Sequence, residues 1–290
     1  MPQSTRILRT RILVLFDFDL TLATDSFAAL LRHCGIGDPD AWRRAHVRPR
    51  VEQGWEVILA RIGALHQLAD GGRGPRLTRA MVEEAGRAIE PFAGVPELFD
   101  RLRATARAVL PDIEVEYHLL TSGFVDIHRA VRFADAFTGM WGTELVFDEG
   151  RGGALAFPKR IVTHNEKALV ILALAKGIDP LGPNAPRDAH RDVPDEQMHV
   201  PLDQVVYVGD GGSDLAAFGL LNRAGGVAIA ACKAESAEDW AGADAMRAER
   251  RVENLAPQGF GEGSEMLRSL ELAVGAIARR IALRQLGAGE

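Results

Sequence analysis

Two aspartates, Asp17 and Asp19, stand directly after an apolar segment near the N-terminus. That segment, residues 12–16, is short, branched and aromatic, which is typical of a strand buried on both faces of a parallel sheet. Side chains two residues apart along a strand point to the same side, so the two carboxylates are expected to lie close together. They repel each other there unless a cation or a shared proton lies between them. The plainer alternative is a loop of solvated acids after a strand.

A second acidic group follows another apolar segment, residues 205–208, much later in the chain. This segment runs into a glycine-rich turn that carries Asp210, and Asp214 stands near the start of the helix predicted next. Glycines there let the backbone and a ligand approach each other closely. A dinucleotide-binding G-x-G-x-x-G motif is excluded because Asp214 occupies the position of its third glycine. The alternative is an ordinary strand, turn and helix with Ser213 or Asp214 as the helix cap.

Between these acids lie a pair of hydroxyls and a lysine that could bind an anion. Thr121, Ser122 and Gly123 follow a predicted strand and precede a helix, where a hydroxyl and helix N–H groups can hold a phosphate oxygen. Such hydroxyls more often only cap a helix. Lys167 falls in the first turn of a predicted helix, where a cation opposes the helix dipole and so indicates a role other than stability. A solvated surface lysine is the alternative, and Lys159 is a second candidate for the role.

The elements that would position these residues alternate as in an α/β protein. Apolar segments at 115–120 and 226–230 resemble the first strand, and helical patterns separate the strands after about residue 92. This order predicts a Rossmann-like parallel sheet covered by helices, which binds ligands at the carboxyl ends of its strands. The final apolar helix, residues 264–283, is expected to pack on the sheet edge. The proline-rich residues 179–201 are expected to form an exposed loop.

The first strand is separated from the rest of the core by a segment with helical patterns only, far longer than a strand crossover needs. We therefore predict that residues 23–91 form an inserted helical cap, with a return hinge at 91–94, while residues 1–22 and 92–290 form the core. The basic cluster of this insertion is either a solvated face or a contact to a second anionic group of the substrate. Its members are Arg43, Arg44, Arg48 and Arg50. Asp25 could instead meet a substrate amine.

In chain order, the motifs Asp-x-Asp-x-Thr, Thr, Lys and Gly-Asp-Gly-x-x-Asp resemble those of the haloacid dehalogenase-like (HAD) phosphohydrolase superfamily. The resemblance covers residues 12–22 and about 92–232, and it is more specific in the first and last motifs than in the middle two. The helical insertion directly after the first motif is similar to the cap of phosphoserine-phosphatase-like members. The resemblance implies a Rossmann-like core, an aspartyl-phosphate intermediate and Mg²⁺ as the cofactor.

The resemblance implies a role for each of the four acids. Asp17 resembles the nucleophile and Asp19 the general acid and base, while Asp210 resembles a metal-binding carboxylate that Asp214 supports. Mg²⁺ prefers oxygen ligands, which Asp17, Asp210 and the backbone carbonyl of Asp19 could supply. The cation would also relieve the repulsion between Asp17 and Asp19. We therefore expect all four acids to belong to the metal site.

The other motif residues are expected to hold the phosphate. The resemblance gives Thr121 the role of the phosphate-binding hydroxyl, with Ser122 and Gly123 beside it. A register error of one residue would exchange the two hydroxyls. Lys167 resembles the lysine that stabilises the phosphate in these enzymes. Phosphoryl transfer mainly needs positioning and charge neutralisation, which a lysine and a metal ion provide.

The expected function is that of a Mg²⁺-dependent phosphatase that acts on a small phosphomonoester. The alternatives are a phosphomutase or a dehalogenase of the same superfamily, and a non-catalytic phosphate-binding relic. A dehalogenase needs a nucleophilic aspartate but no acid two residues later, so Asp19 argues against it. A zinc site is not expected, because the scattered histidines form no ligand pair on a helix. His128 and His164 are expected at the surface or behind the site.

Composition restricts the class of protein and of partner. The chain of 290 residues is 47% apolar and 26% charged, as in globular proteins. Its net charge of −6 predicts no basic face for nucleic acid, and no segment reaches the ~20 apolar residues of a membrane helix. Two cysteines, Cys34 and Cys232, make no disulfide framework. We expect a cytoplasmic protein whose partner is a small phosphorylated metabolite, without nucleic acid or membrane contacts, and the oligomeric state stays open.

Overall fold

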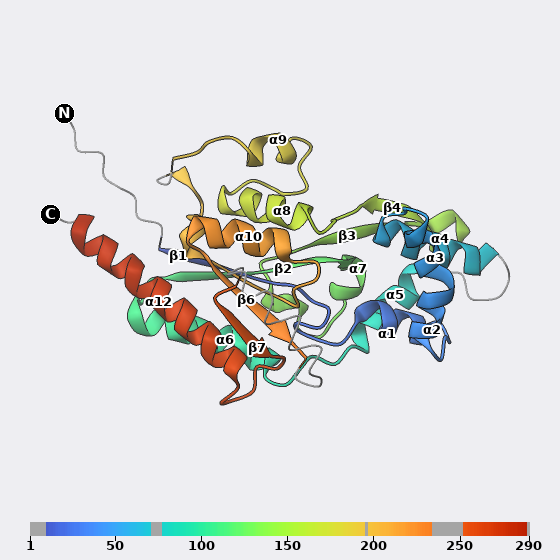
Figure 1. Ribbon diagram of the computed structural model, residues 1–290, viewed down its shortest axis with the longest axis horizontal. Coiled ribbons are helices and arrows are strands. Elements are labelled where there is room, and N and C mark those ends of the chain that lie inside the picture. Colours follow the sequence, from blue (N-terminus) through green and yellow to red (C-terminus); the bar gives the residue numbers. More distant parts are fainter. Residues whose placement is uncertain (1–9, 71–76, 195–196, 234–251, 289–290) are drawn as a thin grey trace.

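The computed structural model of the chain describes residues 10–70, 77–194, 197–233 and 252–288, which include one sheet of seven strands (Figure 1). The strand order is β4-β3-β2-β1-β5-β6-β7, and every neighbouring pair is parallel except β3 and β4. The strands are β1 (Arg11–Phe16), β2 (Glu114–Phe124), β3 (Gly139–Asp148), β4 (Ala154–Arg160), β5 (Val205–Gly209), β6 (Val227–Cys232) and β7 (Asn254–Pro257). The predicted α/β class with a Rossmann-like parallel sheet is confirmed.

β1 lies in the centre of the sheet, as its apolar sequence predicts. Ile12 to Phe16 are all 0% exposed, and the strand pairs with β2 on one side and β5 on the other. Phe16 is level with Leu119 of β2 and with Val208 of β5. The residues that follow these three positions therefore come together at the carboxyl edge of the sheet, where parallel sheets bind ligands.

Helices cover both faces of this sheet (Figure 1). Leu13 and Leu15 of β1 belong to an apolar cluster that includes α8 and α10, whereas Val14 and Phe16 belong to one that includes α6 and α12. This alternation is what a strand buried on both faces requires. The helices of the core are α6 (Val95–Val109), α7 (Val125–His128), α8 (Glu166–Ala175), α9 (Ala185–Ala189), α10 (Leu215–Ala224) and α12 (Glu265–Ala288).

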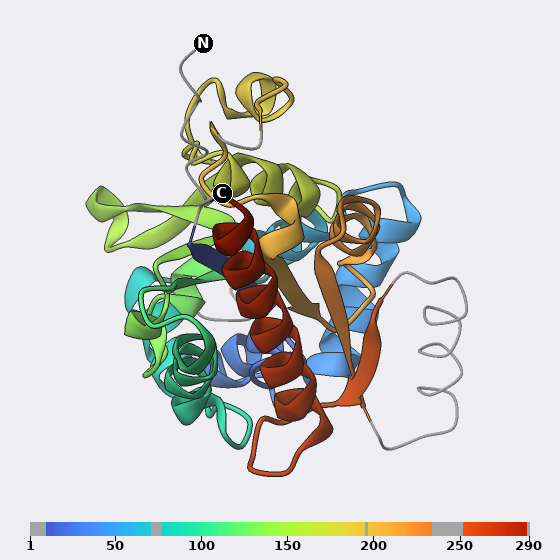
Figure 2. The same cartoon turned by 90° about the vertical axis from the view of Figure 1, so that its left-hand side faces the viewer.

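The last helix, α12, covers more of the sheet than the sequence predicted. It extends from the edge strand β7 across the face to β6 and β1 and lies beside α6, instead of packing only on the sheet edge (Figure 2). Its buried side chains recur every three or four residues and need a wide surface to pack against. They include Met266, Leu270, Val274, Ile277 and Ile281. Neither α12 nor any other helix of the described ranges is long and apolar enough to cross a membrane.

The chain between β1 and α6 is helical wherever the structure describes it, apart from turns and isolated bridges. Its helices are α1 (Ser26–His33), α2 (Pro39–Trp42), α3 (Arg48–Glu52), α4 (Val57–Asp70) and α5 (Arg79–Arg87), with a π-helical turn at Arg43–Val47. The two ends of this insertion meet, because the Phe92 N–H donates to the Leu22 carbonyl over 2.8 Å and Ala23 pairs with Pro91. The division into core and cap domains stays a prediction, since both parts contribute to one apolar cluster.

Two segments contain more structure than the sequence predicts. β3 and β4 form an antiparallel hairpin that contacts the insertion, where the Leu155 N–H donates to the Leu77 carbonyl over 2.7 Å. Residues 179–201, expected as an exposed loop, include α9 and the buried Met198 and Val200. α9 packs on α8, and this contact helps to bury the few apolar side chains of the charged segment. Short 3-10 turns lie at Ala134–Ala136, Glu149–Arg151 and Leu202–Gln204.

Candidate active site

Asp17 is the first residue after β1, and the sheet holds it in place. Its backbone N–H donates to the Val208 carbonyl over 2.8 Å, which continues the pairing of β1 and β5 by one residue. The residue is 4% exposed, and its Oδ1 accepts the Phe18 N–H at 2.8 Å. Burial, opposed by the positive charge of Lys167, raises the pKa of Asp17 to about 8. A carboxylate in this position needs nearby cations to be ionised at neutral pH.

Lys167 is the cation beside Asp17. It is completely buried in the first turn of α8, and its Nζ lies 3.1 Å from Asp17 Oδ2, 2.6 Å from Asp214 Oδ1 and 3.0 Å from Ser213 Oγ. The ammonium group therefore has hydrogen bonds to Ser213 and Asp214 and an ion pair with Asp17. Burial alone would lower the pKa of Lys167, but the two carboxylates outweigh burial and raise it above its usual value. The alternative of a solvated surface lysine is wrong.

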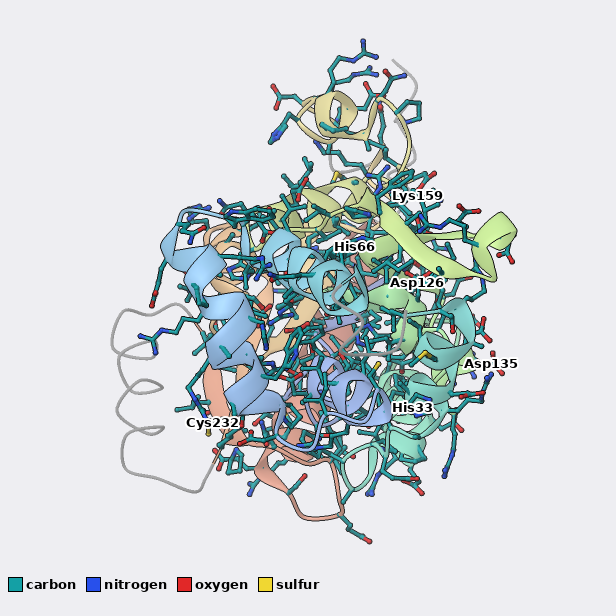
Figure 3. All side chains as sticks on the ribbon, turned by 90° about the vertical axis from the view of Figure 1, so that its right-hand side faces the viewer. His33, His66, Asp126, Asp135, Lys159 and Cys232 are labelled. Carbon is teal, nitrogen blue, oxygen red and sulfur yellow. The ribbon has the colours of Figure 1, made fainter. Side chains whose placement is uncertain are left out.

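Lys159, the second candidate for this role, lies elsewhere in the molecule. Its side chain is 63% exposed and pairs with Glu144 at 3.0 Å. Figure 3 shows it on the β3–β4 hairpin, toward the periphery of the molecule. The structure therefore brings Lys167, and not Lys159, to the carboxylate of Asp17.

Asp214 is completely buried, and hydrogen bonds to both of its carboxylate oxygens hold it in place. Its Oδ1 accepts the Tyr207 hydroxyl at 2.6 Å, and its Oδ2 accepts the Gly211 N–H at 3.2 Å. Asp214 occupies the N-cap position of α10, as the alternative predicted, but its side chain forms no capping hydrogen bond and binds Lys167 and Tyr207 instead. A Cβ on Gly209 would lie 2.1 Å from Asp214 Oδ2, which explains the glycine at the end of β5. Tyr207 was not among the predicted site residues, although a phenol in an otherwise apolar strand is a signal that the sequence carries.

Three of the four predicted metal ligands come together. Asp17, Asp210 and Asp214 each offer a carboxylate oxygen, and these oxygens lie within 4.8 Å of one another. Burial, together with the charge of Asp214, raises the pKa of Asp210 to about 6. Three carboxylates face one ammonium group, so the cluster fits a divalent cation, and its oxygen donors are those that Mg²⁺ prefers. Within the part of the chain that the structure describes, the side chain of Asp19 does not belong to this cluster.

The carboxylate of Asp19 is bound by the insertion. Asp19 begins a tight turn in which Leu20 has a φ of 60°, a left-handed conformation that is strained for a residue with a side chain. The Leu20 N–H donates to the Ala23 carbonyl over 2.8 Å and closes the turn. Asp19 Oδ1 accepts the Ser26 N–H from the start of α1 at 2.7 Å. Burial, and the negative charge of Asp25, raise the pKa of Asp19.

Thr121 is the hydroxyl that lies opposite Asp19. A Cβ built on Gly123 would lie 3.3 Å from both Asp19 Oδ2 and Thr121 Oγ1, so the two oxygens converge beside this glycine. Thr121 Oγ1 also accepts the Gly123 N–H at 3.0 Å. The Ser122 hydroxyl is buried and has no hydrogen-bond partner among the described residues. The geometry therefore favours Thr121 over Ser122 as the phosphate-binding hydroxyl. Both residues lie within β2, which continues past its predicted end to Phe124.

Asp25 and Arg43 of the insertion bind each other. Arg43 Nη2 lies 2.5 Å from Asp25 Oδ1, and the same oxygen caps α1 by accepting the Ala28 N–H at 2.8 Å. Asp25 is therefore already paired, and it is not the free acid for a substrate amine that the sequence allowed. Within the predicted basic cluster, Arg48 and Arg50 instead form hydrogen bonds to other residues of the insertion.

Arg61 of α4 is a further cation near Asp19, and the sequence analysis did not identify it. Its guanidinium lies 5.1 Å from the centroid of the Phe27 ring, and that of Arg43 lies 5.2 Å from the same ring. Burial lowers the pKa of Arg61, while the charges of Asp19 and Asp25 oppose this effect. The insertion therefore brings positive charge as well as an N–H group toward Asp19.

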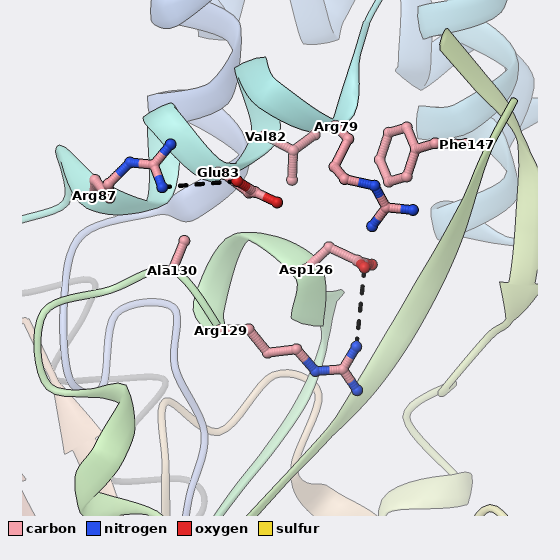
Figure 4. Close-up of a pocket in the computed structure, with 8 residues that line it drawn as sticks. All are labelled: Arg79, Val82, Glu83, Arg87, Asp126, Arg129, Ala130 and Phe147. Atoms are coloured by element: carbon pink, nitrogen blue, oxygen red, sulfur yellow. Dashed lines mark ion pairs between the residues drawn. The ribbon is translucent and has the colours of Figure 1, made fainter. Parts of the chain in front are cut away.

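A separate hollow of about 340 Å³ lies where α5, α7 and β3 meet (Figure 4). Its three arginines all have partners. Arg79 lies 4.9 Å from the Phe147 ring centroid, Arg87 pairs with Glu83 at 3.7 Å, and Arg129 pairs with Glu144 at 2.9 Å. The arginines that line the hollow are therefore not free to bind an anion, and none of the predicted site residues lines it. The lining residues are Arg79, Val82, Glu83, Arg87, Asp126, Arg129, Ala130 and Phe147.

Comparison with known proteins identifies the fold. No protein-family model and no curated protein sequence matches the chain. A phosphoserine phosphatase in the form of a phospho-aspartyl intermediate analogue has a TM-score of 0.53 at 18% identity, over 90% of this chain and 98% of that one. A substrate-bound phosphoserine phosphatase has a TM-score of 0.54 at 17% identity, over 90% and 98%. A probable phosphoserine phosphatase from Vibrio cholerae has a TM-score of 0.57 at 16% identity, over 94% and 67%. The chain therefore has the HAD-like fold of phosphoserine phosphatases, as the motif order predicted.

Proposed function

We propose that this protein is a Mg²⁺-dependent phosphatase that hydrolyses a small phosphomonoester through a phosphorylated Asp17. The observation that carries the proposal is the buried Asp17 carboxylate, with Lys167 at 3.1 Å and the Asp210 and Asp214 carboxylates within 4.8 Å. A carboxylate with a fixed ammonium group and room for a divalent cation can attack an anionic phosphate, because both positive charges reduce the repulsion. The fold shared with phosphoserine phosphatases supports this proposal.

The proposed reaction has two steps. In the first, an oxygen of Asp17 attacks phosphorus, the ester P–O bond breaks, and Asp19 donates a proton to the leaving oxygen. In the second, Asp19 takes a proton from water, and the water oxygen attacks phosphorus and releases phosphate from Asp17. Thr121 and Lys167 hold the phosphate oxygens in both steps. Bound Mg²⁺, held by Asp17, Asp210 and Asp214, would neutralise charge on the phosphate.

Burial at the site supports a small phosphate ester as the substrate. Asp17 is 4% exposed, Thr121 1% and Lys167 0%, so the groups that would meet the phosphoryl group lie almost entirely below the surface. We also propose that residues 23–91 act as the cap of this site. Two of its residues support that role, since Ser26 binds Asp19 and Arg61 adds positive charge beside it.

The test is turnover of p-nitrophenyl phosphate by the purified protein with Mg²⁺, after exhaustive chelation, and after Mg²⁺ is added back. We expect release of nitrophenol and phosphate that stops on chelation and returns with Mg²⁺. A panel of phosphorylated metabolites then identifies the preferred ester. Turnover that survives exhaustive chelation would contradict the metal requirement. Binding of phosphate without turnover of any ester would identify a non-catalytic relic.

A further inference from the structure

His128 of α7 is completely buried beside the turn that carries Asp19. Its ring lies against Phe18, with 4.0 Å between the ring centroids, and its Nε2 lies 3.0 Å from the Ser26 hydroxyl oxygen. Its Nδ1 is buried without a hydrogen-bond partner among the residues that the structure describes. The sequence expectation of a place behind the site is met, and that of a surface place is not.

Ser26 connects this histidine to Asp19. It is 1% exposed at the start of α1, and its backbone N–H donates to Asp19 Oδ1 at 2.7 Å. Its hydroxyl oxygen is held in turn by His128 Nε2, so the histidine fixes the residue that binds Asp19. The core helix α7 and the insertion helix α1 thus meet in one chain of hydrogen bonds that ends at Asp19.

The direction of these hydrogen bonds follows from the burial of His128. Burial, only slightly opposed by the charge of Asp25, lowers the pKa of His128 to about 3, so the ring is neutral at physiological pH. A neutral imidazole carries one hydrogen, and a buried N–H without an acceptor is unfavourable. The hydrogen therefore belongs on Nε2, which has the Ser26 hydroxyl as acceptor. The Ser26 hydroxyl then acts as an acceptor, which fixes Ser26 and the backbone N–H that it donates to Asp19 Oδ1.

These contacts hold one oxygen of Asp19 and leave the other for the reaction. Oδ1 accepts the Ser26 N–H, whereas Oδ2 lies on the side of Thr121, since both Oδ2 and Thr121 Oγ1 are 3.3 Å from a Cβ built on Gly123. The hydroxyl proposed to hold the phosphate is therefore on the same side as the free carboxylate oxygen. An ester oxygen that leaves the phosphate would depart toward Oδ2.

We propose that Ser26 and His128 are positioning residues for proton transfer by Asp19, an inference that rests on the proposed function. They fix the carboxylate so that Oδ2 carries the proton and faces the leaving oxygen. When the P–O ester bond breaks, its electron pair stays on the leaving oxygen, which takes the proton from Oδ2 and departs as an alcohol. Asp19 becomes a carboxylate, ready to accept a proton from the attacking water in the second step.

The experiment measures the first step in single turnovers with an alkyl and an aryl phosphate, in the presence of Mg²⁺. Ser26→Ala keeps the backbone N–H but removes the hydroxyl, and His128→Leu removes the ring nitrogens. Both variants should slow release of the alkyl alcohol about tenfold, because a misplaced carboxylate transfers the proton poorly. Release of nitrophenol, which leaves without a proton, should change less than about twofold. His128→Gln, whose amide N–H can replace Nε2–H, should restore most of the alkyl rate.

Thr105→Ala is the matched control, because it removes a hydroxyl that bonds the Arg101 carbonyl within α6 and should change neither rate. In an Asp19→Asn background, Ser26→Ala should have no further effect on the alkyl rate. Equal slowing for both leaving groups, or no slowing for either, would overturn the positioning role while leaving phosphatase activity intact. If His128→Leu fails to fold, Ser26→Ala decides alone. A wild-type protein that hydrolyses neither ester would instead overturn the proposed function itself, and the positioning role with it.

Discussion

The two halves of the candidate site hold their aspartates by different means. Asp17 belongs to the core, where it contacts Lys167 at 3.1 Å and lies within 4.8 Å of two further carboxylates. Asp19 belongs to the turn into the insertion, where it accepts a hydrogen bond from the Ser26 N–H. The neutral His128 contacts the hydroxyl of the same serine. Burial raises the pKa of both acids. The side-chain partner of Asp17 is a charged lysine, whereas the hydrogen bond that holds Asp19 comes from a neutral backbone N–H, with the opposite charges of Asp25 and Arg61 nearby.

This difference separates two chemical tasks. Charged surroundings suit a carboxylate that must stay ionised, bind a cation and meet an anionic phosphate. A buried site with a neutral hydrogen-bond donor suits a carboxyl group that must hold a proton and release it to a leaving group. Different elements supply the two halves of the site. β1, β5 and α8 carry the residues of the ionic half, whereas α1 and α7 carry those of the neutral half. Variants in the two halves should therefore separate charge stabilisation from proton transfer.

The largest effect is expected for Asp17→Asn in the ionic half. An amide is a poor nucleophile and a poor metal ligand, so turnover should fall at least about a thousandfold for every phosphomonoester. The fold should survive, because the side chain keeps its shape and Lys167 keeps Asp214 as a counter-ion at 2.6 Å. Steady-state rates and circular dichroism measure the two outcomes. A folded variant with nearly normal activity would contradict the role of Asp17 as the nucleophile.

Asp19→Ala in the neutral half should instead discriminate between leaving groups. Loss of the general acid should slow the first step about 10²- to 10⁴-fold for alkyl phosphates and only mildly for aryl ones. The second step should be slow for both, because both pass through the same phosphorylated Asp17. With an aryl phosphate the variant should show a burst near one equivalent per site, followed by a slow steady state.

Rapid-quench kinetics and intact-mass measurement look for that burst and for a phosphoryl group on the protein. The wild-type protein with the same aryl phosphate is the control. Equal slowing of both leaving groups, with neither burst nor adduct, would show that Asp19 transfers no proton. The two halves would then not be chemically distinct.

Lys167→Ala should weaken the ionic half without altering leaving-group preference. Removal of one preorganised charge should cost about 2–4 kcal/mol of transition-state stabilisation, measured as kcat/KM. It also leaves Asp17 and Asp214 without their shared cation, so the metal-free protein should lose about 3–5 kcal/mol of unfolding free energy in urea. Lys159→Ala, on an exposed ion pair, should change either quantity by less than about 1 kcal/mol. The reverse ranking would place the phosphate site at Lys159.

Local sequence patterns were sufficient for the ionic half. The apolar residues 12–16 and 205–208 predict two buried strands, and parallel strands that end level bring Asp17 and Asp210 to the same edge. Helix polarity made Lys167 a candidate beside Lys159, and the resemblance to the HAD superfamily assigned it the phosphate role. The strands and the motif residues depend on short stretches of sequence, which is why they could be predicted without a structure.

The neutral half depends on contacts between distant residues, which no local pattern records. Ser26 and His128 lie 102 positions apart and belong to no motif. The edge of the sheet was missed for a related reason. After two buried residues, β4 alternates between half-buried and exposed positions, and so lacks the continuous apolar run of a central strand. The boundary of the insertion was read from its helical patterns, but its packing against the core depends on side chains such as Phe27 and Phe124, 5.8 Å apart between ring centroids.

The smallest effect concerns the neutral half alone and its response to acid. Burial lowers the pKa of His128 to about 3, against a usual value of 6.5. Between these values the unfolded chain binds a proton at His128 and the folded protein does not, so the free energy of unfolding falls as the pH drops through 6.5. From pH 7 to pH 5 this histidine should account for a loss of about 2 kcal/mol. His128→Gln cannot titrate and should lack that loss, while carboxylates common to both proteins cancel in the difference. Urea unfolding of both proteins at the two pH values gives the comparison. The same pH dependence in both would mean that His128 binds a proton equally well in the folded and the unfolded protein, which would contradict a neutral imidazole beside Ser26.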